Sequence, residues 1–343
     1  MTSAVVVLAL LWLGLTAYAL FGGADFGGGI WDLLAGTTSR GRSSRDLIEH
    51  SLAPVWEANH VWLIFVLVVL WTAFPPAFAA VASTLYIPLT LAAMGMIARG
   101  SAFAFRKTVP PGPLQMLFGA AFALSSLLTP FFLGTVAGAV ASGRVPRGIA
   151  QGDVFRSWLS PTALLGGVLC VGTCAYLAAV FLCSDAVRSG DDRLARGFRT
   201  RALLAGAVVG GVAVAGIGVV HADAPALWRG LTGRGAPLVV LSVLAGIAGL
   251  VLLFRGSYGA ARVAVGLAVA AVIWGWGVAQ YPLMLPPDVT VDNAAAGSAT
   301  LNAMVVTLLV GSLLLVPALV LLYRLFQTAP DRTPALPGRS RPD

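Results

Sequence analysis

Residues 55–62, VWEANHVW, bring a carboxylate, an amide and an imidazole to the start of a strongly apolar segment. Glu57 and His60 are three residues apart and share one face of a helix, whereas Asn59 points to another side. Ionisable groups are costly inside such a segment and are candidates for function by default. A carboxyl group beside an imidazole can take up and pass on protons near neutral pH. Glu57 therefore indicates a proton path, or else an acid that favours a helix N-terminus or binds an arginine of a partner.

A second acid, Asp25, lies in the glycine-rich segment FGGADFGGGIWD. Gly23 and Gly27 have the small-xxx-small spacing that lets another helix approach closely, and Gly28 extends the same run. The glycines are also expected to loosen the helix, so that water or a neighbouring carbonyl group reaches the carboxylate. At 1.5 Å per residue, Asp25 lies about 32 Å from the start of its apolar segment. This depth places it near the same membrane face as Glu57.

The other polar residues and the cysteines give weaker signals. Asp32, two turns beyond Asp25, is expected to be a solvated acid at the membrane interface. His60 is the only histidine inside an apolar segment, so it has no partner histidine with which to hold a haem. Three cysteines share one apolar run and are expected to be small buried side chains: Cys170, Cys174 and Cys183. The sequence thus predicts neither a metal site nor a catalytic residue in this chain.

The composition indicates the class of protein. Of the 343 residues, 58% are hydrophobic and only 10% are charged, whereas soluble domains carry about 25% charged residues. So few charges cannot cover a soluble surface of this size, and the chain is therefore predicted to be an integral membrane protein. Its net charge of +8 is then read by position along the chain, and does not indicate nucleic-acid binding.

Nine apolar stretches are long enough to cross a bilayer, which takes about 20 residues per helix. Pro75-Pro76 is expected to make the turn between the second and third, because proline cannot continue a helix with full hydrogen bonding. The predicted fold is a single all-α membrane domain of nine transmembrane helices, with residues 327–343 as a flexible cytoplasmic tail. The nine spans are 4–35, 55–74, 76–99, 114–139, 160–183, 202–221, 236–254, 260–281 and 300–326.

Basic residues gather on one side of these spans. The side of the first loop carries 17 arginines and lysines, Arg99 among them, against 5 on the opposite side. The positive-inside rule therefore places the first loop and the C-terminus in the cytoplasm and the N-terminus outside. The arginine-rich segment 188–201 is explained as an inside-topology signal that contacts anionic lipid, and any further role is left open.

Three segments carry a family resemblance: GADFGGGIWDLL, SLAPVWEANHVWLI and the later loop YPLMLPPDVTVDNAAAGSATL, with LTPFFLGTVAG near residue 130 as a further piece. The sequence resembles the subunit II family of cytochrome bd quinol oxidases over its whole length, and VWEANHVWLI is the most specific part. The resemblance implies a nine-helix subunit built as two four-helix bundles plus one extra helix, with the N-terminus outside the cell membrane of a bacterium.

The resemblance also implies a function. Complexes of this family oxidise quinol and reduce dioxygen to water with protons from the cytoplasm, which builds a proton motive force without pumping. Haems b and d belong to subunit I, the obligate heterodimer partner, so this chain is a non-haem subunit that is not active alone. Some members hold a quinone as a structural lipid in this subunit. The quinone type and any small accessory subunit are left open.

Two acids can be carried over from the family to this chain. Asp25 matches a family acid in the first span, and Glu57 matches a position that is often aspartate, so both are assigned to the proton pathway. The supporting shell of Glu57 comprises Trp56, Asn59, His60 and Trp62. Two alternatives stay open: a proton-coupled secondary transporter that uses the same two acids, and a structural scaffold in which neither acid matters. Transporters of that kind usually have broken helices at the midplane, whereas both acids here lie toward one face.

Overall fold

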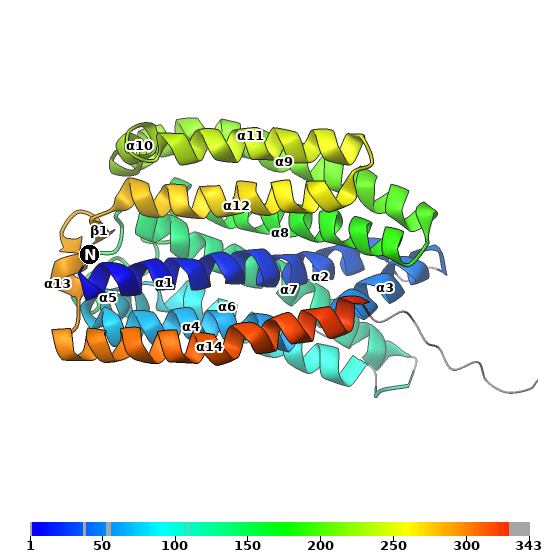
Figure 1. The fold of residues 1–343 in the computed structure, drawn as a ribbon, viewed down its shortest axis with the longest axis horizontal. Coiled ribbons are helices and arrows are strands. Elements are labelled where there is room, and N and C mark those ends of the chain that lie inside the picture. Colours follow the sequence, from blue (N-terminus) through cyan, green and yellow to red (C-terminus); the bar gives the residue numbers. More distant parts are fainter. Residues whose placement is uncertain (1, 37–38, 53–55, 107, 111, 329–343) are drawn as a thin grey trace, which may run out of the picture.

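The protein is almost entirely helical in a computed structural model (Figure 1). The structure describes residues 2–36, 39–52, 56–106, 108–110 and 112–328, without the side chains of residues 39, 40, 52, 56, 57, 106, 322, 323 and 325–328. The side chains of Trp56 and Glu57, and nearly all of the predicted tail, therefore lie outside the described residues. Long helices run side by side, and the N-terminus and the end of the last helix lie at opposite ends of the bundle. We call these the N-terminal end and the far end.

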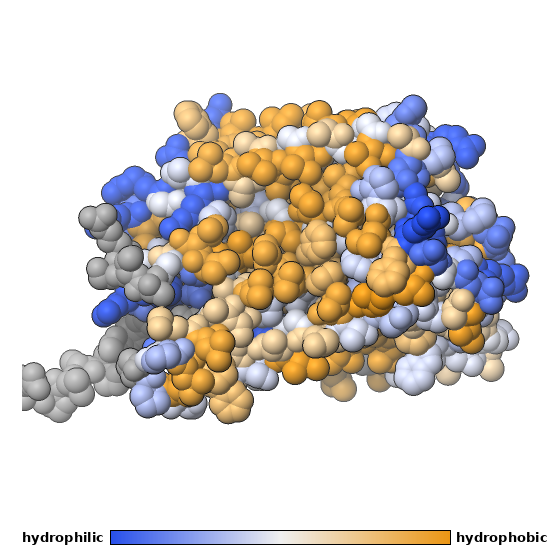
Figure 2. All heavy atoms as spheres, turned by 180° about the vertical axis from the view of Figure 1, so that it is seen from behind, coloured by the Kyte–Doolittle hydropathy of each residue, from blue (hydrophilic) through white to orange (hydrophobic). Residues whose placement is uncertain are grey.

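The long helices have the character of membrane spans. Eight helices in the described part of the chain are long and apolar enough to cross a bilayer, or nine if the bent pair Ala58–Ala73 and Pro75–Thr84 counts as one span. On the face drawn in Figure 2, apolar side chains form a broad belt between two polar ends. Exposing such a belt to water would cost free energy, whereas contact with lipid chains does not. The chain is therefore a multi-pass membrane protein.

The first span is built from three helical segments that follow one another without a break. They are α1 (Ser3–Ala17), a five-residue π-helical turn η1 (Tyr18–Gly22) and α2 (Gly23–Ala35). The other helices are α3 (Ser39–Leu52), α4 (Trp56–Ala73), α5 (Pro75–Thr84), α6 (Tyr86–Arg106), α7 (Pro113–Ala141), α8 (Pro161–Arg188), α9 (Asp192–Asp223), α10 (Pro225–Thr232), α11 (Ala236–Phe254), α12 (Tyr258–Gln280), α13 (Val291–Ala294) and α14 (Ser298–Thr328).

The third span differs from its prediction over residues 76–99. Two helices occupy this region, because α5 is bent by 118° from α4 and α6 then starts afresh at Tyr86. Pro88 explains the restart, since proline is tolerated in the first turn of a helix but disrupts its interior. The shift moves the end of the span from residue 99 to Arg106. Arg99, which the sequence prediction assigned to a cytoplasmic loop, therefore lies inside α6.

Two further elements were not expected. The segment predicted as the first loop contains the helix α3, which is too polar to be found in a search for apolar spans. It lies at the far end (Figure 1), where its Ile48 is buried against Phe122 of α7 and Phe198 of α9. The helix α9 begins at Asp192 and not at residue 202, so the arginines from Arg193 onward are helical.

Helix neighbours define how the bundle is organised. The helix α8 packs against α2, α7 and α9, while α11 pairs with α12, and α14 lies along α1 and α4. At the N-terminal end, the short strands β1 (Leu283–Leu285) and β2 (Val289–Thr290) form an antiparallel hairpin. This hairpin and α13 help to cover the core of that end, which includes Phe74 and Leu85. The helices α2, α7 and α8 all pack against one another, so an internal site can be built from their side chains.

Candidate functional site

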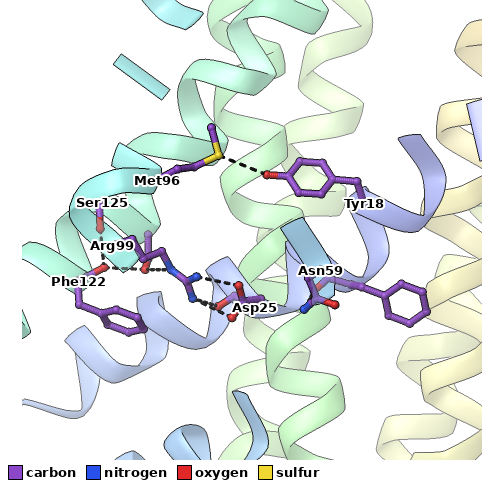
Figure 3. Close-up of polar contacts among 9 residues, drawn as sticks. Tyr18, Asp25, Asn59, Met96, Arg99, Phe122 and Ser125 are labelled. Atoms are coloured by element: carbon purple, nitrogen blue, oxygen red, sulfur yellow. Dashed lines mark hydrogen bonds and ion pairs between the residues drawn. The ribbon is translucent and has the colours of Figure 1, made fainter. Parts of the chain in front are cut away.

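Asp25 on α2 and Arg99 on α6 form a buried ion pair (Figure 3). Nη1 of Arg99 lies 2.7 Å from Oδ2 of Asp25, and Nη2 lies 2.8 Å from Oδ1 and 3.0 Å from the backbone carbonyl oxygen of Asp25. The exposed fraction of the two side chains is 3% for Arg99 and 0% for Asp25. Two parallel N–H to oxygen contacts between a planar guanidinium and a carboxylate are among the strongest polar contacts in proteins.

The remaining surfaces of the Arg99 guanidinium are also occupied. Its Nε donates to Oγ of Ser126 on α7 at 2.9 Å, and this hydroxyl donates in turn to the carbonyl oxygen of Phe122 at 2.6 Å. The rings of Phe26 and Phe122 lie 5.0 Å and 4.8 Å from the guanidinium carbon. Two aromatic rings thus lie close to the guanidinium, and the faces of such rings attract a cation. The pair joins α2, α6 and α7 in one compensated cluster.

The glycine run explains how α2 comes close enough to its neighbours. A Cβ atom added at Gly27 would lie 1.9 Å from the carbonyl oxygen of Cys174 on α8, and one at Gly29 would lie 2.1 Å from Oγ of Ser126 on α7. A Cβ at Gly23 would meet Leu177 on α8 at 3.3 Å. Without the glycines, α2 could not lie between α7 and α8 at this spacing.

The same run is closely packed in the structure. The helix α2 is regular from Gly23 to Ala35, Gly28 is buried within it, and Asp25 is only 1% exposed. Asp32 is also buried, at 8% exposure, where a solvated acid was expected. The helix α3, which the sequence did not predict, packs against α2 at the far end.

The start of α4 packs against the same segment of the first span. Nδ2 of Asn59 donates to the carbonyl oxygen of Phe21 at 3.3 Å (Figure 3), inside the π-helical turn. The ring of His60 lies edge-on to Phe26 with the centroids 6.1 Å apart, so His60 and Arg99 contact the same aromatic ring. The backbone turn that carries Glu57 is therefore next to the helix that carries Asp25.

The predicted shell of Glu57 is thus only partly described. Asn59 is 2% exposed, and its Oδ1 has no hydrogen-bond partner in the described part of the chain. Trp62 packs against the cluster that contains Tyr18 and Phe26, and makes an edge-on ring contact with Phe65 with the centroids 6.3 Å apart. Trp56 and Glu57 lie outside the described side chains, so their contacts stay predictions.

Sequence reasoning missed Arg99, the residue that holds Asp25. Counting the third span from Pro76 placed Arg99 at its end, in the interface. The sequence does contain a signal, because the apolar run continues beyond it through Ala102, Phe103 and Phe105. An arginine followed by a further apolar turn indicates a buried charge that needs a partner.

Metal ligands do not gather anywhere in the described residues. No group of three or more His, Cys, Asp or Glu side chains there could hold a metal ion. His60 contacts Phe26, and His221, at the end of α9, contacts the ring of Trp228 at 5.3 Å. Charge pairing between Asp25 and Arg99 is the main polar interaction described in this region.

Comparison with known proteins identifies the family. The family model for cytochrome bd terminal oxidase subunit II matches residues 3–326. The solved structure of bd oxidase from Geobacillus thermodenitrificans is similar, with a TM-score of 0.74 and 27% sequence identity over 96% of this chain and 100% of the other. The cytochrome bd ubiquinol oxidase subunit 2 of Bacillus subtilis (strain 168) is 25% identical over 86% of this chain and 88% of its own. The cytochrome bd-I ubiquinol oxidase subunit 2 of Escherichia coli (strain K12) is 27% identical over 49% of this chain and 45% of its own. The chain belongs to the cytochrome bd terminal oxidase subunit II family.

Proposed function

We propose that this chain is the haem-free subunit of a quinol:oxygen oxidoreductase, and that it forms part of a cytoplasmic proton route toward the oxygen-reducing haem of its partner, subunit I. The observation that carries the proposal is the packing of the start of α4 against α2 beside the buried Asp25–Arg99 pair. It brings the backbone turn of Glu57 and the carboxylate of Asp25 to neighbouring positions in one half of the bundle.

The two acids have different roles in this proposal. Arg99 binds both carboxylate oxygens of Asp25, and breaking this pair would leave a charged group unpaired in a buried interior. Glu57, in the first turn of α4, is the group that exchanges protons with the cytoplasm. Asp25 takes part only while its ion pair with Arg99 is open.

Nine spans with the N-terminus outside form part of the proposal. An odd number of crossings is supported by the position of the N-terminus and of the end of α14 at opposite ends of the bundle (Figure 1). This number is reached when the bent α4–α5 pair counts as one span. Moving Arg99 from the loop to the interior leaves the large excess of basic residues on the side of the first loop. The far end would then face the cytoplasm, with the chain in a bacterial cell membrane.

The cofactors and partners follow from the family. Haems b and d are assigned to subunit I, as the resemblance to the family implies. Quinol and oxygen are substrates of the complex, and a structural quinone or a small accessory subunit is compatible with the fold. The transporter alternative is not favoured, since the similar proteins are named as oxidase subunits. A passive scaffold is the remaining rival.

Turnover of the assembled complex tests the proposal against the scaffold. Glu57→Gln keeps the shape of the side chain but cannot release a proton, and is expected to lower quinol oxidase turnover at least about tenfold, or roughly 1.4 kcal/mol on the limiting step. Glu57→Asp should retain much of the activity. Asp46→Asn, which removes an exposed acid from the neighbouring helix α3, is the matched control and should leave turnover unchanged.

Haem spectra and proton uptake are measured on the same preparations. Haem content should be native in all three variants, because none of the residues is assigned to a haem. If Glu57→Gln turns over oxygen at the native rate with normal proton uptake, the chain is a scaffold and the proton route runs elsewhere.

A further inference from the structure

The guanidinium of Arg201 on α9 is half-buried but lacks an anionic partner. It lies over two aromatic rings, 5.7 Å from the centroid of Trp31 on α2 and 4.7 Å from that of Phe198, one turn earlier on α9. Within the described residues, no carboxylate pairs with it, and none of its N–H groups donates a hydrogen bond. The rings hold the plane of the guanidinium, and its N–H donors remain available.

Three other arginines at the far end already contact an oxygen atom of the protein. Asp185 on α8 pairs with Arg188 and lies 3.9 Å from Arg262. Arg199 donates to the carbonyl oxygen of Phe254 at 2.5 Å, at the end of α11. Arg201 differs from these because a half-buried cation with unfilled donors carries a desolvation cost that a bound anion would remove.

The depth of Arg201 in α9 matches a layer of lipid headgroups. The helix has 32 residues and is about 48 Å long, so it exceeds the roughly 30 Å of bilayer hydrocarbon. Arg201 lies about 33 Å from the last residue of the helix, Asp223, at 1.5 Å per residue. If the N-terminal end of the bundle lies at one membrane surface, Arg201 lies at the other. Trp31 beside it is of the residue type that is enriched in this layer.

The surface next to Arg201 is suited to acyl chains. Leu204 and Val208, three and seven residues further along α9, are each 63% exposed. These spacings put them on the same side of the helix as Arg201, toward the middle of the apolar belt. A free anion would make no use of this surface, whereas a lipid would place its phosphate on the guanidinium and its chains along the helix.

We propose that Arg201, held by Trp31 and Phe198, binds the phosphate group of an anionic phospholipid at the far end of the bundle. A guanidinium matches a phosphate with two parallel hydrogen bonds, which an ammonium group cannot reproduce. Inorganic phosphate shares this chemistry but lacks the chains. The arginine-rich segment therefore contains one built lipid site in addition to its general attraction for anionic membranes.

Lipid binding is measured on the intact complex with subunit I, in detergent, by native mass spectrometry and by thermal stability. The probes are phosphatidylglycerol, phosphatidylcholine and inorganic phosphate. Arg201→Gln is expected to weaken phosphatidylglycerol binding about five-fold, the factor for one basic residue at an anionic surface. Arg196→Gln, which removes an exposed arginine of the same helix, should bind as the native complex does. Inorganic phosphate should neither bind nor stabilise.

Three outcomes would overturn the proposal: native phosphatidylglycerol binding by Arg201→Gln, an equal loss in Arg196→Gln, or equal stabilisation by inorganic phosphate. The last would assign the site to a free anion. If Arg201→Gln does not assemble, Arg201→Lys keeps the charge and the chain length. It should assemble and still bind the lipid more weakly than the native complex, because the planar fork is lost. Native affinity in the lysine variant would contradict the guanidinium–phosphate geometry.

Discussion

Removing one partner of the Asp25–Arg99 pair should harm the protein more than removing both. Asp25→Asn leaves the Arg99 guanidinium charged inside a core where it is 2% exposed. Arg99→Gln leaves the Asp25 carboxyl group without its cation at 1% exposure. Breaking a buried pair in this way typically costs about 3–5 kcal/mol, whereas replacing both charges by groups of similar shape is often close to neutral.

The two single variants remove different contacts. Asp25→Asn keeps the side chain's volume and one acceptor, and the contact of Nη2 with the backbone carbonyl of residue 25 survives. Arg99→Gln also removes the 2.9 Å contact of Nε with Ser126 and both aromatic contacts. Hydrogen bonds to charged groups contribute about 1.5–3 kcal/mol each. Arg99→Gln should therefore be the more damaging of the two, and the double variant should recover most of the charge penalty.

A double-mutant cycle on the detergent-solubilised complex measures the coupling. Unfolding or loss of assembly is followed for the native complex, the two single variants and the double variant. We expect a coupling energy of at least about 2 kcal/mol, because contacting groups in one network are not additive. Additive losses, with the double variant less stable than either single one, would show that the two residues do not form a charge pair and would refute this reasoning.

Two glycines make close contacts that an added methyl group would break. Gly27→Ala should prevent α2 from packing on α8, since its Cβ would lie 1.9 Å from the backbone carbonyl oxygen of Cys174, and the yield of assembled complex should fall. The control is Gly210→Ala, which has nothing within 4 Å of the added Cβ and should leave the yield unchanged. Equal yields for the two variants would contradict the packing. Gly277→Ala should displace the indole of Trp12, which its Cβ would approach to 2.3 Å. The expected result is a loss of about 1–3 kcal/mol, measured as a lower midpoint of thermal inactivation, and an unchanged midpoint would rule this contact out.

Most of the helical framework follows from the sequence because hydropathy alone determines where helices can cross lipid. The span predicted over 236–254 coincides with α11, and that over 260–281 differs from α12 by two residues or fewer. The glycine spacing around Asp25 also indicated a close helix contact. Each of these features depends on the local sequence of a single helix, so it can be predicted from that segment alone.

Features that depend on two distant segments were not predicted. Arg99 and Asp25 are 74 residues apart in the sequence, and no local pattern connects them. The bend after α4 shifted the following span and concealed the buried arginine, because the apolar run continues through both α5 and α6. Arg201 was hidden in the same way, since the rings that hold it come from α2 and from α9 itself.

The sequence assigns two acids to one proton route, and we propose that they act differently. Asp25 has a cation bound to both of its carboxylate oxygens and has almost no exposed surface, so its first contribution is to hold α2, α6 and α7 together. Glu57 lies in the first turn of α4, beside Asn59, whose buried Oδ1 still lacks a donor among the described residues. A proton route needs groups that can change their charge or their hydrogen bonds, and a fully compensated ion pair resists both. Substitutions of the two acids should therefore have different effects. Removing the charge of Asp25 should first reduce assembly of the complex. Removing the proton-exchanging carboxyl group of Glu57 should first reduce turnover, in a complex that still assembles.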